Sequence, residues 1–234
     1  MGTSQAIVFV FFGQQYWEQF EVCYKTIPKD WNVIVFSDTI ETEIHKYNFS
    51  HYGVTTPQTV FEKLTYRKNI HKLIDINQYS QIWYSDPDML FTGDILAKYK
   101  DSKSILVSNE PFMDMSNEHF NGGFSDKEVY SLVENFAPAI NGGLYCVPKN
   151  CYSFFEQYES LLNIFSALNP GNMATDQHAL NNLFHRKLNT FELFDKDDVG
   201  FPTRQTEGKY VNHYLGMGLY KLNLMKDKLG INHD

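Results

Sequence analysis

Two carboxylates stand two positions apart at the end of an apolar segment. Asp86 and Asp88 follow the run Ile82-Trp83-Tyr84-Ser85, which is typical of a buried strand. In α/β proteins, ligands bind in the crevice at the carboxyl ends of the strands, so we expect both side chains to reach such a crevice. Carboxylate oxygens are the ligands that Mg²⁺ and Mn²⁺ take, and the bound cation neutralises phosphate oxygens. The sequence therefore predicts a divalent-cation site at these two acids.

The same spacing recurs at Asp195 and Asp197, within a polar loop. Only the first pair lies at the tip of a predicted buried strand, where two uncompensated carboxylates would be costly. We therefore predict a metal site at Asp86 and Asp88 and a solvated turn at Asp195 and Asp197.

A histidine and two glycines near the end of the chain form a second candidate. His213 lies beside a short predicted strand, and Gly216 and Gly218 follow it. A single histidine in this position is more often packed or solvated than a ligand. Flexible glycine backbone beside an imidazole nevertheless suits contact with phosphate or metal, so we keep His213 as a candidate ligand.

Two further motifs have both structural and functional interpretations. Asn-Gly-Gly at 141–143 is a turn signal, but it leads into the predicted strand 144–147, where glycines let a ligand approach the backbone. The same motif at 121–123 indicates only a loop. Asp176 and Gln177 lie in the first turn of a predicted helix. An acid at this place interacts favourably with the helix dipole, and it could equally face a ligand.

The elements that must position these residues follow an α/β pattern. The buried runs 6–12 and 33–36 enclose a predicted helix over 16–27, which is the beginning of a βαβ unit. Further strands are predicted at 81–84, 104–107 and 143–147, and helices from Thr56-Pro57, over 152–168 and over 175–187 with Thr175 as its cap. Part of the segment 110–139 is predicted to be a mobile loop over a site. We expect one α/β domain with a mixed, mostly parallel sheet flanked by helices.

Composition excludes several classes of protein. The 234 residues are 43% hydrophobic and carry a formal charge of −8, which argues against nucleic acid as a partner. We find no segment long enough to span a membrane and no basic signal peptide. Peripheral contact with a membrane remains an open alternative. Three cysteines without a Cys-x-x-Cys pair predict neither a disulfide framework nor a zinc ribbon. We expect a cytoplasmic protein.

Read in order, these motifs resemble the GT-A glycosyltransferases, a Rossmann-like fold, and in particular family 8. The resemblance extends over most of the chain and rests on the order of short motifs, each weak alone. They are Ala6-Ile7-Val8-Phe9, Thr65-Tyr66-Arg67, Trp83-Tyr84-Ser85-Asp86-Pro87-Asp88, Asn141-Gly142-Gly143, Asp176-Gln177-His178-Ala179-Leu180-Asn181 and His213-Tyr214-Leu215-Gly216.

The resemblance implies a role for each matching residue. Asp86 and Asp88 would hold Mn²⁺ or Mg²⁺, with His213 as the third protein ligand. Asn141, Asp176 and Gln177 would line the sugar pocket and carry the catalysis, Gln177 lying near the anomeric carbon. The residues implied to contact the nucleotide-sugar, a UDP-sugar, are Arg67, Gly142, Gly143, Gly216 and Lys221. The first 110 residues would bind this donor and residues 111–234 a glycan or another hydroxyl acceptor, with retention of configuration.

The sequence also departs from the family pattern. Phe12-Gly13-Gln14 replaces the acid that contacts base or ribose, and Leu219-Tyr220-Lys221 stands in place of Lys-Pro-Trp. Two alternatives stay open: a nucleotidyltransferase on a related fold, and a protein that binds a nucleotide-sugar without turning it over. A nucleotidyltransferase normally has a basic glycine-rich loop after the first strand, which this sequence lacks.

Overall fold

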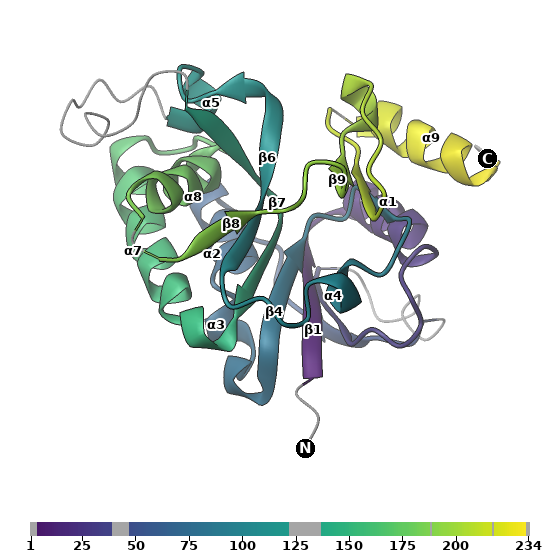
Figure 1. Ribbon diagram of the computed structural model, residues 1–234, viewed down its shortest axis with the longest axis horizontal. Helices are drawn as coiled ribbons and strands as arrows, with labels where there is room; N and C mark the ends of the chain where they lie inside the picture. Colours follow the sequence, from purple (N-terminus) through teal and green to yellow (C-terminus); the bar gives the residue numbers. More distant parts are fainter. Residues whose placement is uncertain (1–3, 39–46, 122–136, 188, 217, 233–234) are drawn as a thin grey trace. The chain divides into compact units, whose positions relative to one another are not determined.

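The computed structural model describes residues 4–38, 47–121, 137–187, 189–216 and 218–232 (Figure 1). As predicted, the protein is α/β, with mixed, mostly parallel strand pairing and flanking helices. The chain forms two compact units, each built from separate segments. The first unit is Met1–Thr56, Trp83–Asp101 and Asp195–Asp234, and the second is Pro57–Ile82 and Ser102–Phe194. A single domain, with donor and acceptor halves that meet near residue 110, stays a prediction.

The first unit contains the predicted βαβ element. Strand β1 (Ser4–Phe11) leads through helix α1 (Gln14–Tyr24) to β2 (Val33–Ser37), and β1 and β2 pair in parallel. Strand β3 (Ser50–Gly53) adds to β2, also in parallel. The apolar side chains of β1 and β2 are almost completely buried, as expected for strands that are covered on both faces.

A small second sheet in this unit has three strands, with β10 in the middle. Strand β10 pairs antiparallel with β5 and parallel with β9, and His213 lies opposite Met89. The bounds in this part of the unit are β5 (Met89–Phe91), α4 (Ile95–Lys98), β9 (Val199–Gly200), η4 (Pro202–Arg204), β10 (Val211–His213) and α9 (Gly218–Leu229). The antiparallel register brings two segments together that are more than a hundred residues apart in the sequence.

The second unit is centred on strand β6 (Ile105–Asp114). It pairs antiparallel with β7 (Pro138–Pro148) and parallel with β8 (Phe191–Leu193). Helix α8 packs on β7, and α7 packs on α8 (Figure 1). The helices of this unit are α2 (Val60–Lys68), α3 (Ile70–Leu73), η2 (Ile76–Gln78), α5 (Glu118–Asn121), η3 (Lys149–Cys151), α7 (Ser153–Leu168) and α8 (Thr175–His185). Strand β4 (Tyr79–Ser85) has its first four residues in this unit and its last three in the other.

Two predicted helix starts are wrong in detail. Helix α2 begins at Val60 rather than at Thr56-Pro57, because Thr59 and Glu62 form a capping box: the Thr59 hydroxyl accepts from Glu62 N (3.1 Å), and the Glu62 carboxylate accepts from Thr59 N (3.2 Å). Thr175 does not cap α8; it is the first helical residue, and its hydroxyl donates to the carbonyl of Asn172 (2.7 Å).

The segment 110–139, part of which is predicted to be a loop, begins and ends in regular structure. Strand β6 continues to Asp114, helix α5 covers 118–121, and β7 begins at Pro138. The remaining stretch, 122–136, lies outside the described residues, as do Gly122 and Gly123 of the first Asn-Gly-Gly motif. Whether this stretch covers a site stays a prediction.

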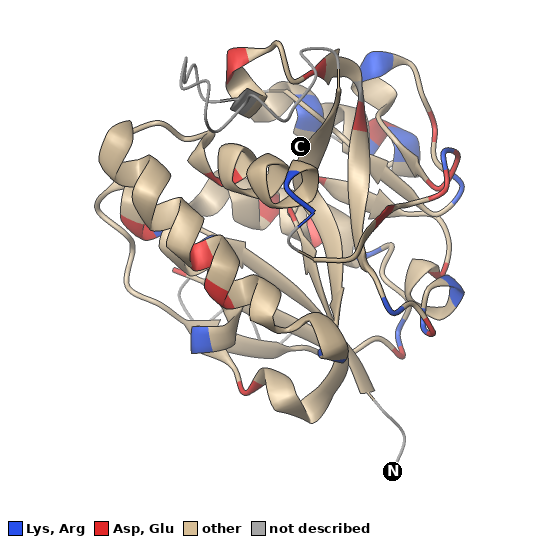
Figure 2. Ribbon diagram, turned by 60° about the vertical axis from the view of Figure 1, so that its left-hand side comes forward, with Lys and Arg blue, Asp and Glu red and all other residues tan. Residues whose placement is uncertain are grey.

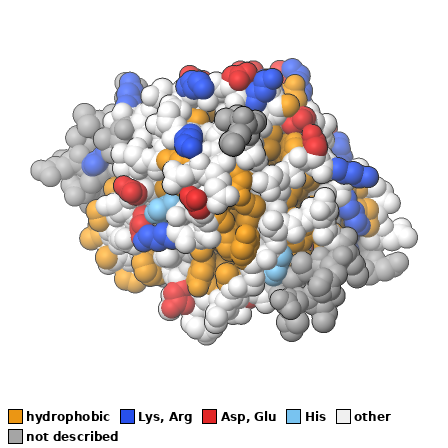
Figure 3. Space-filling model, turned by 90° about the horizontal axis from the view of Figure 1, so that it is seen from below, with side chains coloured by type: hydrophobic (Ala, Val, Ile, Leu, Met, Phe, Trp, Pro, Cys, Tyr) orange, Lys and Arg blue, Asp and Glu red, His pale blue; other side chains and the backbone are white. Residues whose placement is uncertain are grey.

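No described helix is long and apolar enough to cross a membrane. Figure 2 shows that most charged residues lie on helices and loops, and acidic and basic side chains are interspersed on the face seen in Figure 3. The three cysteines all lie in the described ranges and are buried free thiols.

Candidate functional site

Asp86 and Asp88 lie in the turn between β4 and β5, in the first unit. The two strands are buried, so this short turn holds both carboxylates close to the apolar interior. The Tyr84 hydroxyl donates to Asp86 Oδ1 at 2.6 Å, and Tyr214 N donates to the Asp88 carbonyl at 2.9 Å. Asp86 is half-buried, whereas the Asp88 side chain is 9% exposed. Both acids are thus held by the protein before any ligand binds.

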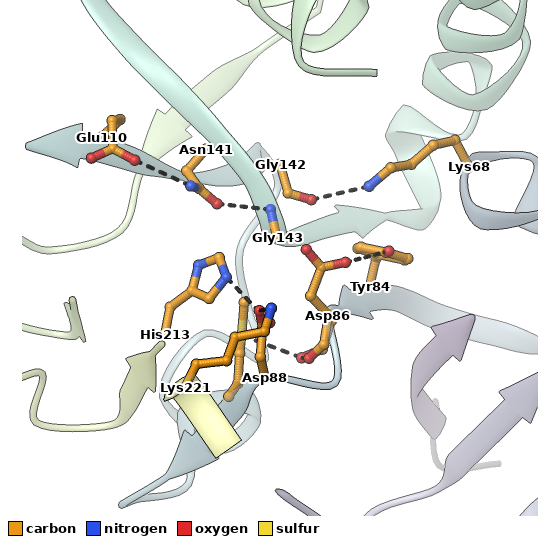
Figure 4. Close-up of polar contacts among 12 residues, drawn as sticks. Lys68, Tyr84, Asp86, Asp88, Glu110, Asn141, Gly142, Gly143, His213 and Lys221 are labelled. Atoms are coloured by element: carbon orange, nitrogen blue, oxygen red, sulfur yellow. Dashed lines mark hydrogen bonds and ion pairs between the residues drawn. The ribbon is translucent and has the colours of Figure 1, made fainter. Parts of the chain in front are cut away.

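The β5–β10 register brings His213 to these acids, as the resemblance implied. One ligand atom from each of Asp86, Asp88 and His213 lies within 4.8 Å of the other two (Figure 4). His213 Nε2 is 3.3 Å from Asp88 Oδ1, and the imidazole is 4% exposed. Asp88 Oδ1 is buried and has no hydrogen-bond partner among the described residues. A buried carboxylate oxygen that makes no hydrogen bond has room for a further ligand, and a bound cation would complete its surroundings.

Lys221 from helix α9 occupies the other side of Asp88. Its ammonium group donates to Asp88 Oδ2 at 2.6 Å and lies 6.0 Å from the centre of the Tyr16 ring. Gly216 and Gly218, just before this lysine, have φ values of 124° and 59°, which glycine adopts most readily. The predicted diphosphate-binding lysine is therefore paired with a metal-ligand candidate in this structure.

The charges around Asp88 set its protonation. Burial alone would raise the pKa of Asp88, but His213 and Lys221 outweigh burial and hold the pKa well below its ordinary value. Burial would lower the pKa of Lys221, and Asp88 more than compensates, so that pKa is raised. The site therefore presents an ionised carboxylate, as metal coordination requires.

The donor set fits a divalent cation. Two carboxylates and one imidazole are ligands that Mn²⁺ accepts, and Mg²⁺ favours the carboxylate oxygens. Three protein ligands leave coordination positions for a substrate or water. Asp88 Oδ1 is ion-paired with His213 but has no hydrogen bond among the described residues, and this open position favours a metal ligand over a purely structural ion pair.

The second Asp-x-Asp motif behaves as the sequence predicted. The Asp195 and Asp197 side chains are 72% and 66% exposed, and they pair with Lys98 (2.7 Å) and Lys209 (3.2 Å). Sequence spacing alone could not separate the two motifs, whereas the buried strand before Asp86 did.

A separate polar site in the second unit is built on a bulge in β7. Val107 lies opposite Tyr145 and Ser108 opposite Asn141, so residues 142–144 have no partner in β6. Side chains accept hydrogen bonds from two of the backbone N–H groups in this bulge: Gly142 N donates to Gln177 Oε1 (2.9 Å), and Gly143 N donates to Asn141 Oδ1 (2.9 Å). Bulges are common next to functional sites, because they redirect side chains.

Lys68 is the buried cation of this polar site. Its ammonium group donates to Gly142 O at 3.1 Å (Figure 4), lies 3.4 Å from Asp176 Oδ2, and is 5.5 Å from the centre of the Tyr145 ring. The Lys68 side chain is 1% exposed, whereas Arg67, the residue named from the sequence, is half-buried. The signal for Lys68 was its place four residues after the buried Leu64, on the inner face of α2.

Hydrogen bonds from neighbouring residues hold Asp176 and Gln177. The Tyr158 hydroxyl donates to the Asp176 carbonyl (3.0 Å), and Asn181 Nδ2 donates to the Gln177 carbonyl (2.8 Å). Asn181 also exchanges two hydrogen bonds with the backbone of Ile140, next to Asn141. The predicted pocket residues are thus brought together by α8 and the β7 bulge.

The sequence reasoning also missed Glu110. This acid is 4% exposed, and its Oε2 accepts a hydrogen bond from Asn141 Nδ2 at 3.2 Å. Glu110 lies at the start of the segment 110–139, part of which is predicted to be a loop. An acid in a loop is normally solvated, so nothing in the sequence gave reason to select this residue.

The predicted residues therefore form two groups. The proposed metal ligands meet in the first unit, and Asn141, Asp176 and Gln177 meet in the second. No known protein-family model matches this chain, and no curated protein matches it significantly.

Proposed function

We propose that this protein is a metal-dependent glycosyltransferase that transfers a hexose from a UDP-sugar to a hydroxyl group of a glycan or another acceptor, with retention. The observation that carries the proposal is the convergence of Asp86, Asp88 and His213 around a buried carboxylate oxygen without a hydrogen bond. The order of motifs that resembles family 8 supports it, and the acids, the histidine and Asn141, Asp176 and Gln177 of these motifs lie in the two polar sites.

The side chains have distinct roles in this proposal. Asp86, Asp88 and His213 would hold Mn²⁺ or Mg²⁺, and the bound cation would neutralise charge on the departing diphosphate. Lys221, which pairs with Asp88, would also contact the diphosphate. Asn141, Asp176 and Gln177 orient the hexose.

Lys68 fixes this pocket by pairing with Asp176 and with the Gly142 carbonyl. Arg67 contacts phosphate or sugar from the same helix. The acidic chain can accept an anionic donor because a cation inverts the local charge. Three unpaired thiols suit a reducing compartment, so we place the reaction in the cytoplasm.

The test is Mn²⁺-dependent release of UDP from a panel of UDP-hexoses. Asp86→Asn, Asp88→Asn and His213→Ala should each lower the rate by roughly 100-fold or more, since each removes a ligand from the charge-stabilising centre. Asp197→Asn is the matched control, because it changes the second Asp-x-Asp motif at an exposed side chain. Wild-type rates in all three site variants would overturn the proposal.

The same panel separates the alternatives. Pyrophosphate release from a nucleoside triphosphate and a sugar 1-phosphate would identify a nucleotidyltransferase. Mn²⁺-dependent donor binding in calorimetry, without turnover of any donor, would identify a binding protein.

A further inference from the structure

We infer that Glu110 and Ser108 form hydrogen bonds with hydroxyl groups of the transferred hexose, and that Glu110 also fixes the orientation of the Asn141 amide. This inference rests on the proposed function and adds to it the residues that select the sugar. All of the observations behind it lie within the second unit.

The strand register places these side chains on one face of the β6–β7 pair. Ser108 and Glu110 are two residues apart in β6, so their side chains point to the same side. Asn141 lies directly opposite Ser108 and shares that side, because opposed residues of an antiparallel pair have side chains on a common face. Asn109, between the two, points to the other side and is exposed.

Both inferred residues carry buried oxygens that lack a partner. Ser108 is 2% and Glu110 is 4% exposed, yet Ser108 Oγ and Glu110 Oε1 have no hydrogen-bond partner within the described part of the chain. Buried polar groups are normally paired, so two open oxygens on one face indicate a missing polar partner. A carboxylate only accepts, while a hydroxyl both donates and accepts. Together they match a ligand with several hydroxyl groups.

Glu110 also determines how the Asn141 amide is oriented. Asn141 Nδ2 donates to Glu110 Oε2 at 3.2 Å, and Asn141 Oδ1 accepts from Gly143 N at 2.9 Å (Figure 4). Because this carboxylate oxygen accepts the hydrogen bond, the NH₂ group of the Asn141 amide, and not its oxygen, faces Glu110. In this orientation a sugar hydroxyl would bond the second N–H of Asn141 or the second lone pair of its oxygen. Glu110 is therefore a positioning residue as well as a contact.

The experiment compares Glu110→Gln, Glu110→Asp and Ser108→Ala with the wild type on the accepted UDP-hexose and on its monodeoxy derivatives. The matched control is Asn109→Ala, on the opposite face of the same strand. We measure kcat and KM for each donor, and the calorimetric Kd of UDP in the presence of Mn²⁺.

For Glu110→Gln we expect kcat/KM on the full hexose to fall roughly 10- to 100-fold, the loss typical of a hydrogen bond to a charged group. One deoxy derivative should be used equally well by the wild type and this variant, because it lacks the hydroxyl that Glu110 binds. Glu110→Asp should recover part of the activity, and the Kd of UDP should not change. Ser108→Ala should show the same pattern for a different hydroxyl, which keeps the inference testable if Glu110→Gln does not fold.

If Glu110→Gln lowered kcat/KM equally on every deoxy derivative and also weakened UDP binding, its role would be merely structural and the inference would be overturned. So would wild-type kinetics in both Glu110→Gln and Ser108→Ala. Failure of the proposed function looks different: the wild type itself would then release no UDP from any donor.

Discussion

The Lys221 ammonium group and Asp88 Oδ2 are 2.6 Å apart, on the opposite side of the carboxylate from His213. A positive charge from the protein itself therefore lies beside the group that we propose to bind a cation. It offsets the repulsion that two nearby carboxylates would otherwise feel, and it competes with a metal for the same carboxylate group. This relationship leads to the first prediction.

Lys221→Met should strengthen Mn²⁺ binding in the absence of a donor by roughly 3- to 10-fold, because one nearby positive charge is removed. The same change should weaken UDP binding in the presence of Mn²⁺, since the diphosphate loses a cationic contact. Titration calorimetry of both ligands measures the two effects. Lys226→Met, on the last turn of the same helix, is the control. Unchanged or weaker Mn²⁺ binding in Lys221→Met would contradict the competition.

Lys68→Met should lower the free energy of unfolding by roughly 3–5 kcal/mol, because Asp176 then remains as a buried carboxylate without its cation. Urea denaturation followed by fluorescence gives this value. Lys72→Met is the control on the following helix: Lys72 is 56% exposed and pairs with Glu159, so we expect a change of about 1 kcal/mol or less. If Lys68→Met and Lys72→Met lowered the free energy of unfolding by similar amounts, burial of the Lys68–Asp176 pair would not increase its contribution to stability.

Gly200→Ala should disrupt the small sheet that carries His213. A Cβ atom at this position would lie 2.0 Å from Gly208 N and 2.4 Å from the Glu207 carbonyl carbon, which are backbone atoms that cannot rotate away. We expect a loss of roughly 3 kcal/mol or more in stability and weaker Mn²⁺ binding, because β9 pairs with β10. Thermal unfolding and metal titration test both.

The control for this change is Gly53→Ala, where no described atom lies within 4 Å of the new Cβ. It should alter stability by no more than about 0.5 kcal/mol, as most surface changes do. If a folded Gly200→Ala protein bound Mn²⁺ normally, the pairing of β9 with β10 would not be needed for the metal site.

The native protein should react negligibly with a thiol reagent at pH 8. Burial raises the pKa values of Cys23, Cys146 and Cys151, so little thiolate forms, and access is restricted as well. In denaturant all three should react at once, which colorimetric thiol titration counts. Rapid labelling of a native cysteine would indicate local opening around it.

The sequence alone determined the strands and the proposed metal acids. Long apolar runs such as 6–12 and 33–36 can only be stable when both faces are covered, so their pattern predicted parallel pairing. Asp86 and Asp88 were identifiable as candidates because carboxylates directly after a buried strand need partners to offset their burial. The exposed pair Asp195 and Asp197 has the same spacing, and only the neighbouring residues distinguished it.

Only the tertiary structure decided which distant residues meet. The β5–β10 register placed His213 beside Asp88, and helix packing chose Lys68 rather than Arg67 as the buried cation. The bulge at Asn141 and its contact with Glu110 depend on a strand pairing across a long insertion. Local propensity carries no information about such pairings, because their free energy comes from burial and hydrogen bonds between segments far apart in the chain.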